Sequence, residues 1–309
     1  MDEGEVLVIT GPTASGKSAL AMRLAERLPI TIISADSRQI YRGFDIGTAK
    51  PTPLELATVP HRGVDIVEPT ERYSAAAWAA AADGWITESV DARRVPLVVG
   101  GTGFYIRALV APLFEEPPLD PAARKALGGE LAELETVELR RWVEALDPPR
   151  ARLGRAQLLR AIEVALLSGV PISEWHRRAP GAAPRRVRYL ALDPGPVLAD
   201  RIEERVREML EAGWEAEVAA LLDHVPPDAP AWNASGYRAV RDLVEGRTTR
   251  AAAVERTVID TRRYAKRQRT WIRNQLRDEN VIVIDPRVPA SDVVDAALAW
   301  FSGGREVCR

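Results

Sequence analysis

The stretch GPTASGKSAL, residues 11–20, decides which fold the rest of the sequence is expected to adopt. Its spacing, Gly11-x-x-x-x-Gly16-Lys17-Ser18, is that of a P-loop, in which backbone N–H groups and the next helix N-terminus bind phosphate oxygens. The apolar run 6–10 precedes the loop, and residues 18–28 carry leucines at helical spacing, as a strand-loop-helix unit requires. The motif therefore predicts a phosphate site made of Gly11, Pro12, Thr13, Ala14, Ser15, Gly16, Lys17 and Ser18. A P-loop normally binds a nucleoside triphosphate such as ATP, but these letters leave open which phosphate compound binds and whether water attacks it.

The composition limits the classes of protein to consider. The chain has 309 residues, of which 46% are hydrophobic and 28% charged, with 42 Lys and Arg against 44 Asp and Glu. Because the net charge is close to zero, a nucleic-acid surface requires local segregation of charge. The single cysteine, Cys308, and three histidines favour neither an internal disulfide nor a Cys/His metal cluster. The acidic N-terminus and the lack of a long apolar run predict a cytoplasmic protein without a membrane span, which we expect to be a monomer.

Strand patterns alternate with helix patterns along the chain. Besides the run 6–10, strands are predicted at 31–34 and 96–99, after residue 186, and at 281–286. The predicted fold class is α/β, a P-loop NTPase-like parallel sheet flanked by helices, with a helical insertion domain. Residues 1–116 and 187–309 are assigned to the core with a C-terminal helical part that contacts RNA, and 117–186 to the insertion, because Pro and Gly breaks there separate helical segments.

Ligands of parallel α/β sheets bind beyond the carboxyl ends of the strands. The P-loop, Asp36 and Thr102 all follow predicted strands, so these three stretches are expected to converge on one pocket. Asp36 is a candidate general base or metal ligand. An ATPase would also need an acid at the end of a core strand, but the strand 96–99 ends in Gly-Gly-Thr, which leaves Asp36 and Asp285 as candidates and weakens the ATPase interpretation.

Several blocks, in order, resemble the tRNA dimethylallyltransferase (isopentenyltransferase) family. They are GPTASGKS (11–18), SADSRQIYRGFDIGTAKP (34–51), GGTGFY (100–105), RAIEV and LSGVPIS within 160–173, GYR (236–238) and RRYAKRQRTWIR (262–273). The resemblance covers essentially the whole chain. It implies transfer of a dimethylallyl group from dimethylallyl diphosphate to the exocyclic amine of the adenosine 3′-adjacent to the anticodon, in tRNAs that read codons beginning with U. The P-loop would then hold a diphosphate that leaves intact as pyrophosphate.

The resemblance also implies roles for individual residues. Asp36 would accept the proton of the attacking amine, and Thr102 would donate a hydrogen bond to the bridging oxygen as negative charge develops there. Lys17, a magnesium ion on Ser18, and Arg205 would neutralise the departing diphosphate. Magnesium is the expected cofactor.

Charge does segregate locally. Residues 262–273 contain six basic residues and no acid, with Tyr264 and Trp271 between them, and residues 150–188 contain nine arginines against two acids. With the resemblance, the predicted contacts to the tRNA anticodon stem-loop are Asp36, Ser37, Arg38, Gln39, Thr102, Arg124, Gln157, Leu158, Leu159, Arg160, Ala161, Gly236, Tyr237, Arg238, Lys266, Arg267, Gln268, Arg269 and Trp271.

The sequence departs from the family pattern at a few positions. Leu153-Gly154 and Gln157 stand where the family commonly has Asn-Asp and a further Arg, and Ser235-Gly236-Tyr237 replaces Ile-Gly-Tyr. Three alternatives remain open: a P-loop small-molecule kinase with Asp36 as its base, a prenyltransferase acting on free adenine nucleotides, and a non-catalytic P-loop RNA-binding module.

Overall fold

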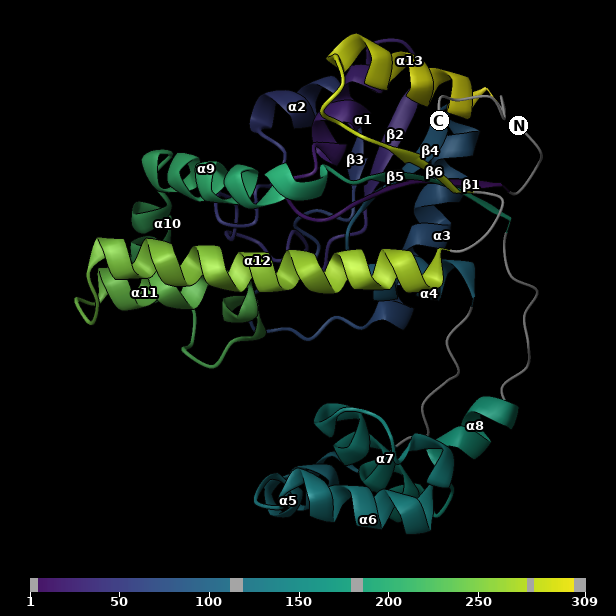
Figure 1. The fold of residues 1–309 in the computed structure, drawn as a ribbon, viewed down its shortest axis with the longest axis vertical. Helices are drawn as coiled ribbons and strands as arrows, with labels where there is room; N and C mark the ends of the chain where they lie inside the picture. Colours follow the sequence, from purple (N-terminus) through teal and green to yellow (C-terminus); the bar gives the residue numbers. More distant parts are fainter. Residues whose placement is uncertain (1–4, 112–118, 179–185, 277–280, 303–309) are drawn as a thin grey trace. The chain divides into compact units, whose positions relative to one another are not determined.

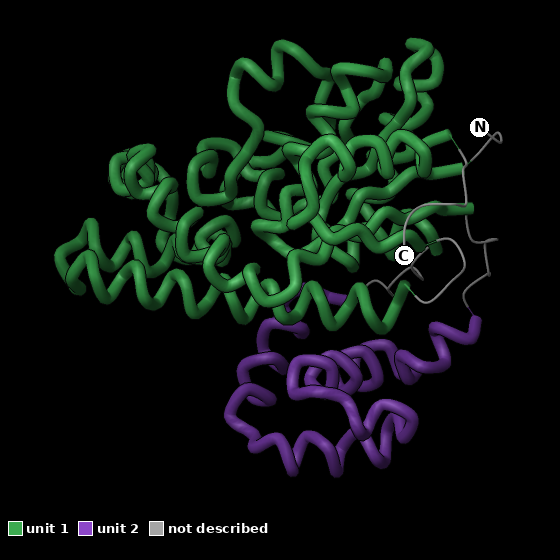
Figure 2. The backbone as a smooth tube through the Cα atoms, turned by 45° about the horizontal axis from the view of Figure 1, so that its top comes forward, with its two compact units in different colours: residues 1–111, 184–309 green, residues 112–183 purple. Residues whose placement is uncertain are grey.

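The computed structural model describes residues 5–111, 119–178, 186–276 and 281–302, which form two compact units (Figures 1 and 2). Unit 1 comprises residues 1–111 and 184–309, and unit 2 residues 112–183. The predicted insertion, residues 117–186, differs from unit 2 by a few residues at each end, and residue 117 lies outside the described residues.

The described part of unit 1 contains a six-stranded parallel sheet in the order β3-β2-β4-β1-β5-β6. The strands are β1 (Val6–Thr10), β2 (Ile30–Ser34), β3 (His61–Arg62), β4 (Val95–Gly100), β5 (Val187–Leu192) and β6 (Val281–Ile284). The predicted α/β class and five of these strands are confirmed. The two-residue strand β3 was not predicted, because two residues give too short a run for the alternating pattern that marks a strand.

Helices cover both faces of the sheet. These are α1 (Lys17–Ala25), α2 (Pro53–Thr58), α3 (Ala75–Asp91), α4 (Gly103–Val110) and α13 (Ala290–Phe301). Apolar side chains of α1 and α13 pack with the strands in one buried cluster that includes Leu24, Leu97 and Trp300. On α3, Trp78 stacks on Tyr105 of α4 at 4.9 Å, and its indole N–H donates to the Ser34 carbonyl at 3.0 Å. β1 lies between β4 and β5 and is buried throughout, so the P-loop begins at the middle of the sheet.

The remaining helices of unit 1 build a second layer beside the carboxyl ends of the strands. They are α9 (Leu198–Glu211), α10 (Trp214–Leu222), α11 (Tyr237–Val244) and α12 (Arg250–Gln275). The long helix α12 runs beside α9 and α11 and reaches α4 (Figure 1). Its 26 residues bring RRYAKRQRTWIR alongside the sheet, at the edge where the P-loop begins.

Unit 2 is helical, as predicted. It consists of α5 (Pro121–Ala132), α6 (Thr136–Leu146), α7 (Arg155–Ser168) and α8 (Ile172–Arg178) around a small apolar core. Among the described residues no single helix is long and apolar enough to cross a membrane, although the bent pair α7 and α8 passes that test together by length and composition.

Candidate functional site

The P-loop is shaped by close backbone packing. A side chain at Gly11 would meet the Leu192 carbonyl oxygen at 2.6 Å, and Gly16 has a φ of +90°, which favours glycine. The Lys17 ammonium donates to the Pro12 carbonyl at 3.0 Å, while the Ser18 hydroxyl belongs to an exposed residue in the first turn of α1. Burial and, next, the charge of Arg205 lower the pKa of Lys17 to about 8. A bound anion would favour the charged ammonium and raise this pKa again, so the loop is suited to phosphate oxygens.

Gln268 of α12 joins the P-loop to the turn after β4. Its side-chain oxygen accepts the Thr13 N–H at 2.8 Å, and its amide nitrogen donates to the Gly101 carbonyl at 3.0 Å. Gln268 is only 5% exposed, so both ends of its amide are committed inside the protein. The structure thus places this residue between two predicted site loops. The sequence predicted that Gln268 contacts tRNA, but in this structure its side chain is bonded inside the protein.

Asp36 and Thr102 lie together, as predicted from their places after two strands. The Thr102 Oγ1 accepts the Ser37 N–H at 3.0 Å and faces the Ser37 hydroxyl at 3.4 Å. One Asp36 carboxylate oxygen accepts the Arg38 N–H at 2.8 Å. The turn needs glycine at residue 100, because a side chain there would meet the Ala35 carbonyl oxygen at 2.2 Å.

Tyr264 of α12 completes this group, since its hydroxyl is near enough to the Thr102 side chain and to Asp36 for both to affect its pKa. Burial and the charge of Asp36 raise the pKa of Tyr264 to about 12, so it stays neutral near pH 7. The sequence suggested Tyr264 only as a stacking face.

Two cavities meet beside Asp36, and Thr102 is not among the residues that line either of them. The larger, about 950 Å³, is lined by the P-loop including Lys17 and Ser18, and the smaller, about 570 Å³, extends between α9, α11 and α12. Five residues line both, namely Thr13, Asp36, Thr48, Arg205 and Met209. Arg205 of α9 is near enough to Lys17 and Asp36 to influence the pKa of Lys17 and to be influenced by Asp36. A phosphate compound on the P-loop and an acceptor beside Asp36 could therefore meet where the cavities join.

The basic residues of α12 divide into two groups. Lys266 and Arg267 are exposed, and the Arg267 guanidinium lies 5.6 Å from the centre of the Tyr264 ring. Arg269 instead bonds Asp193, after β5, with Nε at 3.1 Å and Nη2 at 3.0 Å, so its charge is already paired. Trp271 lies against the backbone of Gly103, where an added side chain would meet its ring at 2.1 Å.

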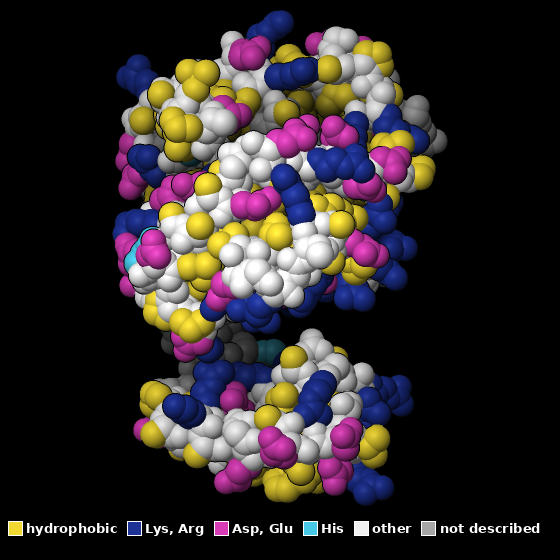
Figure 3. All heavy atoms as spheres, turned by 90° about the vertical axis from the view of Figure 1, so that its left-hand side faces the viewer, with side chains coloured by type: hydrophobic (Ala, Val, Ile, Leu, Met, Phe, Trp, Pro, Cys, Tyr) yellow, Lys and Arg dark blue, Asp and Glu magenta, His cyan; other side chains and the backbone are white. Residues whose placement is uncertain are grey.

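Charged side chains also segregate on the surface. On the face in Figure 3, Lys and Arg gather along one edge of unit 1 and alternate with Asp and Glu elsewhere. This pattern agrees with a chain whose net charge is close to zero but whose basic residues are grouped.

Other predicted tRNA contacts of unit 1 hold the protein together. The Gln39 side chain accepts from the Ser34 hydroxyl at 2.8 Å and donates to the Ala49 carbonyl at 2.9 Å. Tyr237 is fully buried and donates its hydroxyl proton to Glu217 at 2.6 Å. Gly236 has a φ of +87° and no space for a side chain beside Trp214. In contrast, Arg238 is exposed, and it donates to Asn233 at 2.5 Å.

The predicted contacts in unit 2 are similarly mixed. Leu158 and Ala161 are buried in its core and Leu159 packs against it, so the first two side chains are closed to solvent in this structure. Gln157 is exposed and accepts the Gly154 N–H at 3.1 Å, which caps the start of α7 although Gly154 has no side chain of its own. Arg124 and Arg160 both pair with Glu163.

Metal binding by the protein alone is not supported by the described side chains. Among them there is no group of three or more His, Cys, Asp or Glu residues that could hold a metal ion. Magnesium, however, often keeps several waters and binds mainly substrate phosphates, for which one exposed hydroxyl such as that of Ser18 is a suitable protein ligand.

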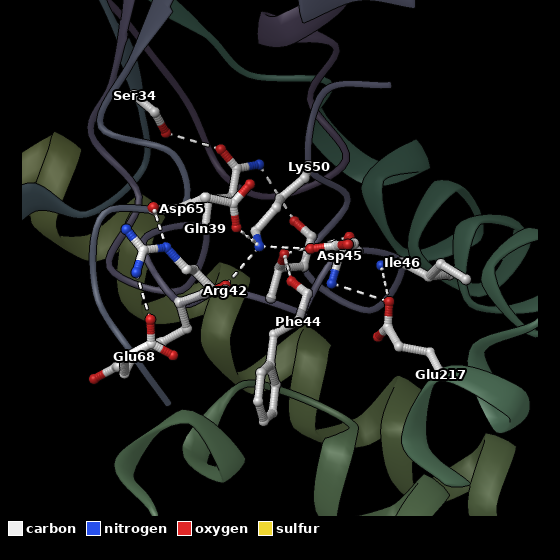
Figure 4. A network of polar contacts seen from close by, with 12 residues as sticks. Ser34, Gln39, Arg42, Phe44, Asp45, Ile46, Lys50, Asp65, Glu68 and Glu217 are labelled. Atoms are coloured by element: carbon white, nitrogen blue, oxygen red, sulfur yellow. Dashed lines mark hydrogen bonds and ion pairs between the residues drawn. The ribbon is translucent and has the colours of Figure 1, made fainter. Parts of the chain in front are cut away.

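Some residues that line the cavities, or hold the loops beside them, carried no recognisable sequence signal. Glu217 contacts the backbone of residues 45 and 46, which are more than 170 positions away, and Lys50 is a buried lysine between two aspartates (Figure 4). Met209 and Trp214 were overlooked because an apolar residue on an amphipathic helix normally indicates only a core position. For Gln268 a signal existed, since Ala253, Thr257 and Ala265 recur at helical spacing on the same inward face.

The fold and the site define an α/β enzyme of the P-loop type. Its phosphate-binding cavity joins a second cavity at Asp36 and Arg205. Comparison with known proteins gives the family. A family model described as IPP transferase matches residues 39–275, and one described as Isopentenyl transferase matches residues 4–62. The chain belongs to the IPP transferase family.

Individual relatives agree with this assignment. A tRNA dimethylallyltransferase of Deinococcus radiodurans is 41% identical over 304 residues, which cover 95% of this chain and 95% of that protein. The structure of a full-length tRNA isopentenylpyrophosphate transferase from Bacillus halodurans matches with a TM-score of 0.70 at 32% identity, over 98% of this chain and 97% of that one. A eukaryotic dimethylallyltransferase acting on tRNA has the same fold, with a TM-score of 0.79 at 23% identity over 99% of this chain and 81% of that chain.

Proposed function

We propose that this protein transfers a dimethylallyl group from dimethylallyl diphosphate to the exocyclic amine of the adenosine next to the 3′ end of the anticodon in tRNA. The observation that carries this proposal is the junction of the two cavities, where Asp36 and Arg205 line both. A phosphate grip on one side and a carboxylate facing a second cavity suit group transfer between two bound molecules. Hydrolysis would instead require a positioned water.

The chemistry follows from the positions of these residues. The carbon–oxygen bond between the allylic carbon and the diphosphate breaks, its electron pair leaves with the diphosphate, and the amine nitrogen forms the new carbon–nitrogen bond. Asp36 accepts the proton that the nitrogen loses. Thr102 Oγ1 accepts the Ser37 N–H at 3.0 Å, and its own proton, which is directed to the Ser37 hydroxyl at 3.4 Å, would turn to the bridging oxygen when the donor is bound.

The departing charge is met by cations on the same side. Arg205 is close enough to Lys17 for its charge to lower the pKa of Lys17, and both residues line the larger cavity. Magnesium arriving with the diphosphate would neutralise further charge, with Ser18 as the protein residue that contacts it.

RNA binding is assigned to the exposed side of α12. Lys266 and Arg267 have no ion pair among the described side chains, and Arg267 and Tyr264 also line the smaller cavity. Phosphate contacts by such cations would give affinity that falls with salt. Enclosure of the acceptor requires that the target base leave the stacked loop and reach Asp36, where the two cavities join.

One experiment tests the proposal against its rivals. The protein is incubated with labelled dimethylallyl diphosphate and tRNA, AMP or no acceptor, and separately with labelled ATP. Label in tRNA alone is the expected result, and it should be limited to tRNAs that read codons beginning with U. Label in AMP would identify a nucleotide prenyltransferase, ATP-dependent phosphorylation a kinase, and RNA binding without transfer a binding module, and each of these results would overturn the proposal.

A further inference from the structure

The segment 44–50, here called the wall loop, is held in place from three sides (Figure 4). At its start Phe44 is fully buried against Tyr237, with ring centres 4.8 Å apart. At its end the buried Lys50 ammonium bonds the Tyr41 carbonyl at 2.5 Å and pairs with Asp45 at 2.6 Å and with Asp65. From the sheet side, Gln39 donates to the carbonyls of residues 48 and 49 at 3.3 and 2.9 Å.

Glu217 of α10 supplies a fourth attachment. One of its carboxylate oxygens accepts the N–H groups of Asp45 at 3.0 Å and Ile46 at 2.6 Å, and the other accepts the Tyr237 hydroxyl at 2.6 Å. Burial and the charge of Glu217 raise the pKa of Tyr237 far above its usual range, so Tyr237 stays protonated and remains a donor. A charged acceptor of backbone N–H groups forms stronger bonds than a neutral one. Glu217 therefore fixes the middle of the wall loop against the α10–α11 pair.

The wall loop borders the place where a donor chain would lie. Thr48 lines both cavities and Gly47 lines the smaller one. Gly47 touches the indole of Trp214 so closely that a Cβ there would meet the ring at 2.2 Å. Ile202, Val206 and Met209, on one face of α9, line the same cavity. The apolar part of this cavity is thus lined by α9 and by Trp214 beside the wall loop, while charged residues such as Asp260 and Arg263 line another part of it.

We propose that Glu217 is a positioning residue for donor-chain length: it holds the wall loop on Trp214, and this contact closes the apolar end of the donor site behind a five-carbon group. The identity of the donor as a prenyl diphosphate rests on the proposed function. With the diphosphate on the P-loop and the reacting carbon beside Asp36, the remaining carbons point along Met209 toward Trp214. A ten-carbon chain would meet the wall loop.

The test measures donor binding without tRNA, so that it does not depend on transfer. Dissociation constants of dimethylallyl diphosphate, geranyl diphosphate and inorganic pyrophosphate are determined by calorimetry for the wild type, Glu217→Ala, Glu217→Gln and Glu215→Ala. Glu215 is the matched control, because it lies on the same helix and, among the described residues, its one ion pair is with the exposed Arg250 at 3.3 Å. Glutamine keeps an oxygen for both loop N–H groups, while the Tyr237 hydroxyl can rotate to accept from its amide.

In Glu217→Ala the preference for dimethylallyl over geranyl diphosphate should fall about tenfold, the size of a small steric difference in an apolar pocket. Pyrophosphate affinity should stay at the wild-type value, and Glu217→Gln and Glu215→Ala should keep the wild-type preference. An unchanged preference in Glu217→Ala, or the same loss in Glu215→Ala, overturns the inference.

A second variant covers the case in which Glu217→Ala does not fold. Met209→Ala enlarges the same space from α9, where Met209 is half-buried, and it should also reduce the preference for the shorter donor. An unchanged preference there would contradict the position assigned to the chain. Failure of the wild type to label tRNA overturns only the proposed function, whereas these affinity ratios decide the inference.

Discussion

Replacing Gln268 by methionine should lower the stability of the protein and weaken the binding of a diphosphate to the P-loop. Methionine has nearly the same length but can neither accept the Thr13 N–H nor donate to the Gly101 carbonyl, which Gln268 bonds at 2.8 and 3.0 Å. Each lost bond and each backbone group left without a partner costs about 1–3 kcal/mol. Two such groups, with Thr13 half-exposed and partly rehydrated, give a loss of about 2–4 kcal/mol in the free energy of unfolding.

The assay is urea unfolding of the wild type, Gln268→Met and the control Gln275→Met, together with pyrophosphate binding. Gln275 lies on the same helix, and its contact with Arg107 at 3.3 Å is exposed, so its replacement should change stability by less than about 0.5 kcal/mol. Gln268→Met should also weaken pyrophosphate binding, because the Thr13 N–H belongs to the P-loop. If Gln268→Met matches the control in both stability and pyrophosphate affinity, the assigned role of Gln268 is refuted.

Three further outcomes are expected from the charged residues of the site. Asp36→Asn should lower kcat by about 10²–10⁴-fold in the labelled-donor assay with little change in tRNA affinity, and normal turnover would remove Asp36 from the base role. Without a bound anion the pKa of Lys17 is about 8, and a diphosphate favours the charged form of this side chain. Pyrophosphate affinity should therefore fall as pH rises above about 8. Lys17→Arg, which cannot lose its proton, should abolish the part of this decline that is due to Lys17. Arg267→Ala should reduce the salt slope of tRNA binding by about 1, whereas Arg269→Ala should leave the slope unchanged, since Arg269 is paired with Asp193.

The central part of the site was predictable because it depends on local sequence. The P-loop, Asp36 and Thr102 each follow a strand of a parallel sheet, and such strands bring their carboxyl ends to one edge whatever their order. The residues that hold these loops were not predictable in the same way. The contact of Glu217 with residues 45 and 46 depends on how α10 packs, and no spacing rule links positions so far apart.

The basic block on α12 illustrates a different difficulty. Its letters suggest one continuous RNA-binding surface, but successive residues of a helix are turned by about 100° and therefore face different surroundings. Lys266 and Arg267 face solvent, Gln268 faces the P-loop, and Arg269 reaches Asp193. A count of charges does not tell which side chains of the helix face solvent and which face the protein. The small or uncharged residues Ala253, Thr257 and Ala265, which recur at helical spacing, mark the inward face.

This division gives one helix two separable tasks. The outer side chains of α12 offer charge to RNA, and the inner Gln268 sets the distance between the loop that holds the diphosphate and the turn that carries Thr102. Since a hydrogen-bonded helix moves as a rigid element, a shift of α12 on docking of tRNA would be felt at both loops through the same side chain. Substitutions on its outer face should therefore change RNA affinity and its salt dependence, whereas substitution of Gln268 should change binding of the donor even when no RNA is present.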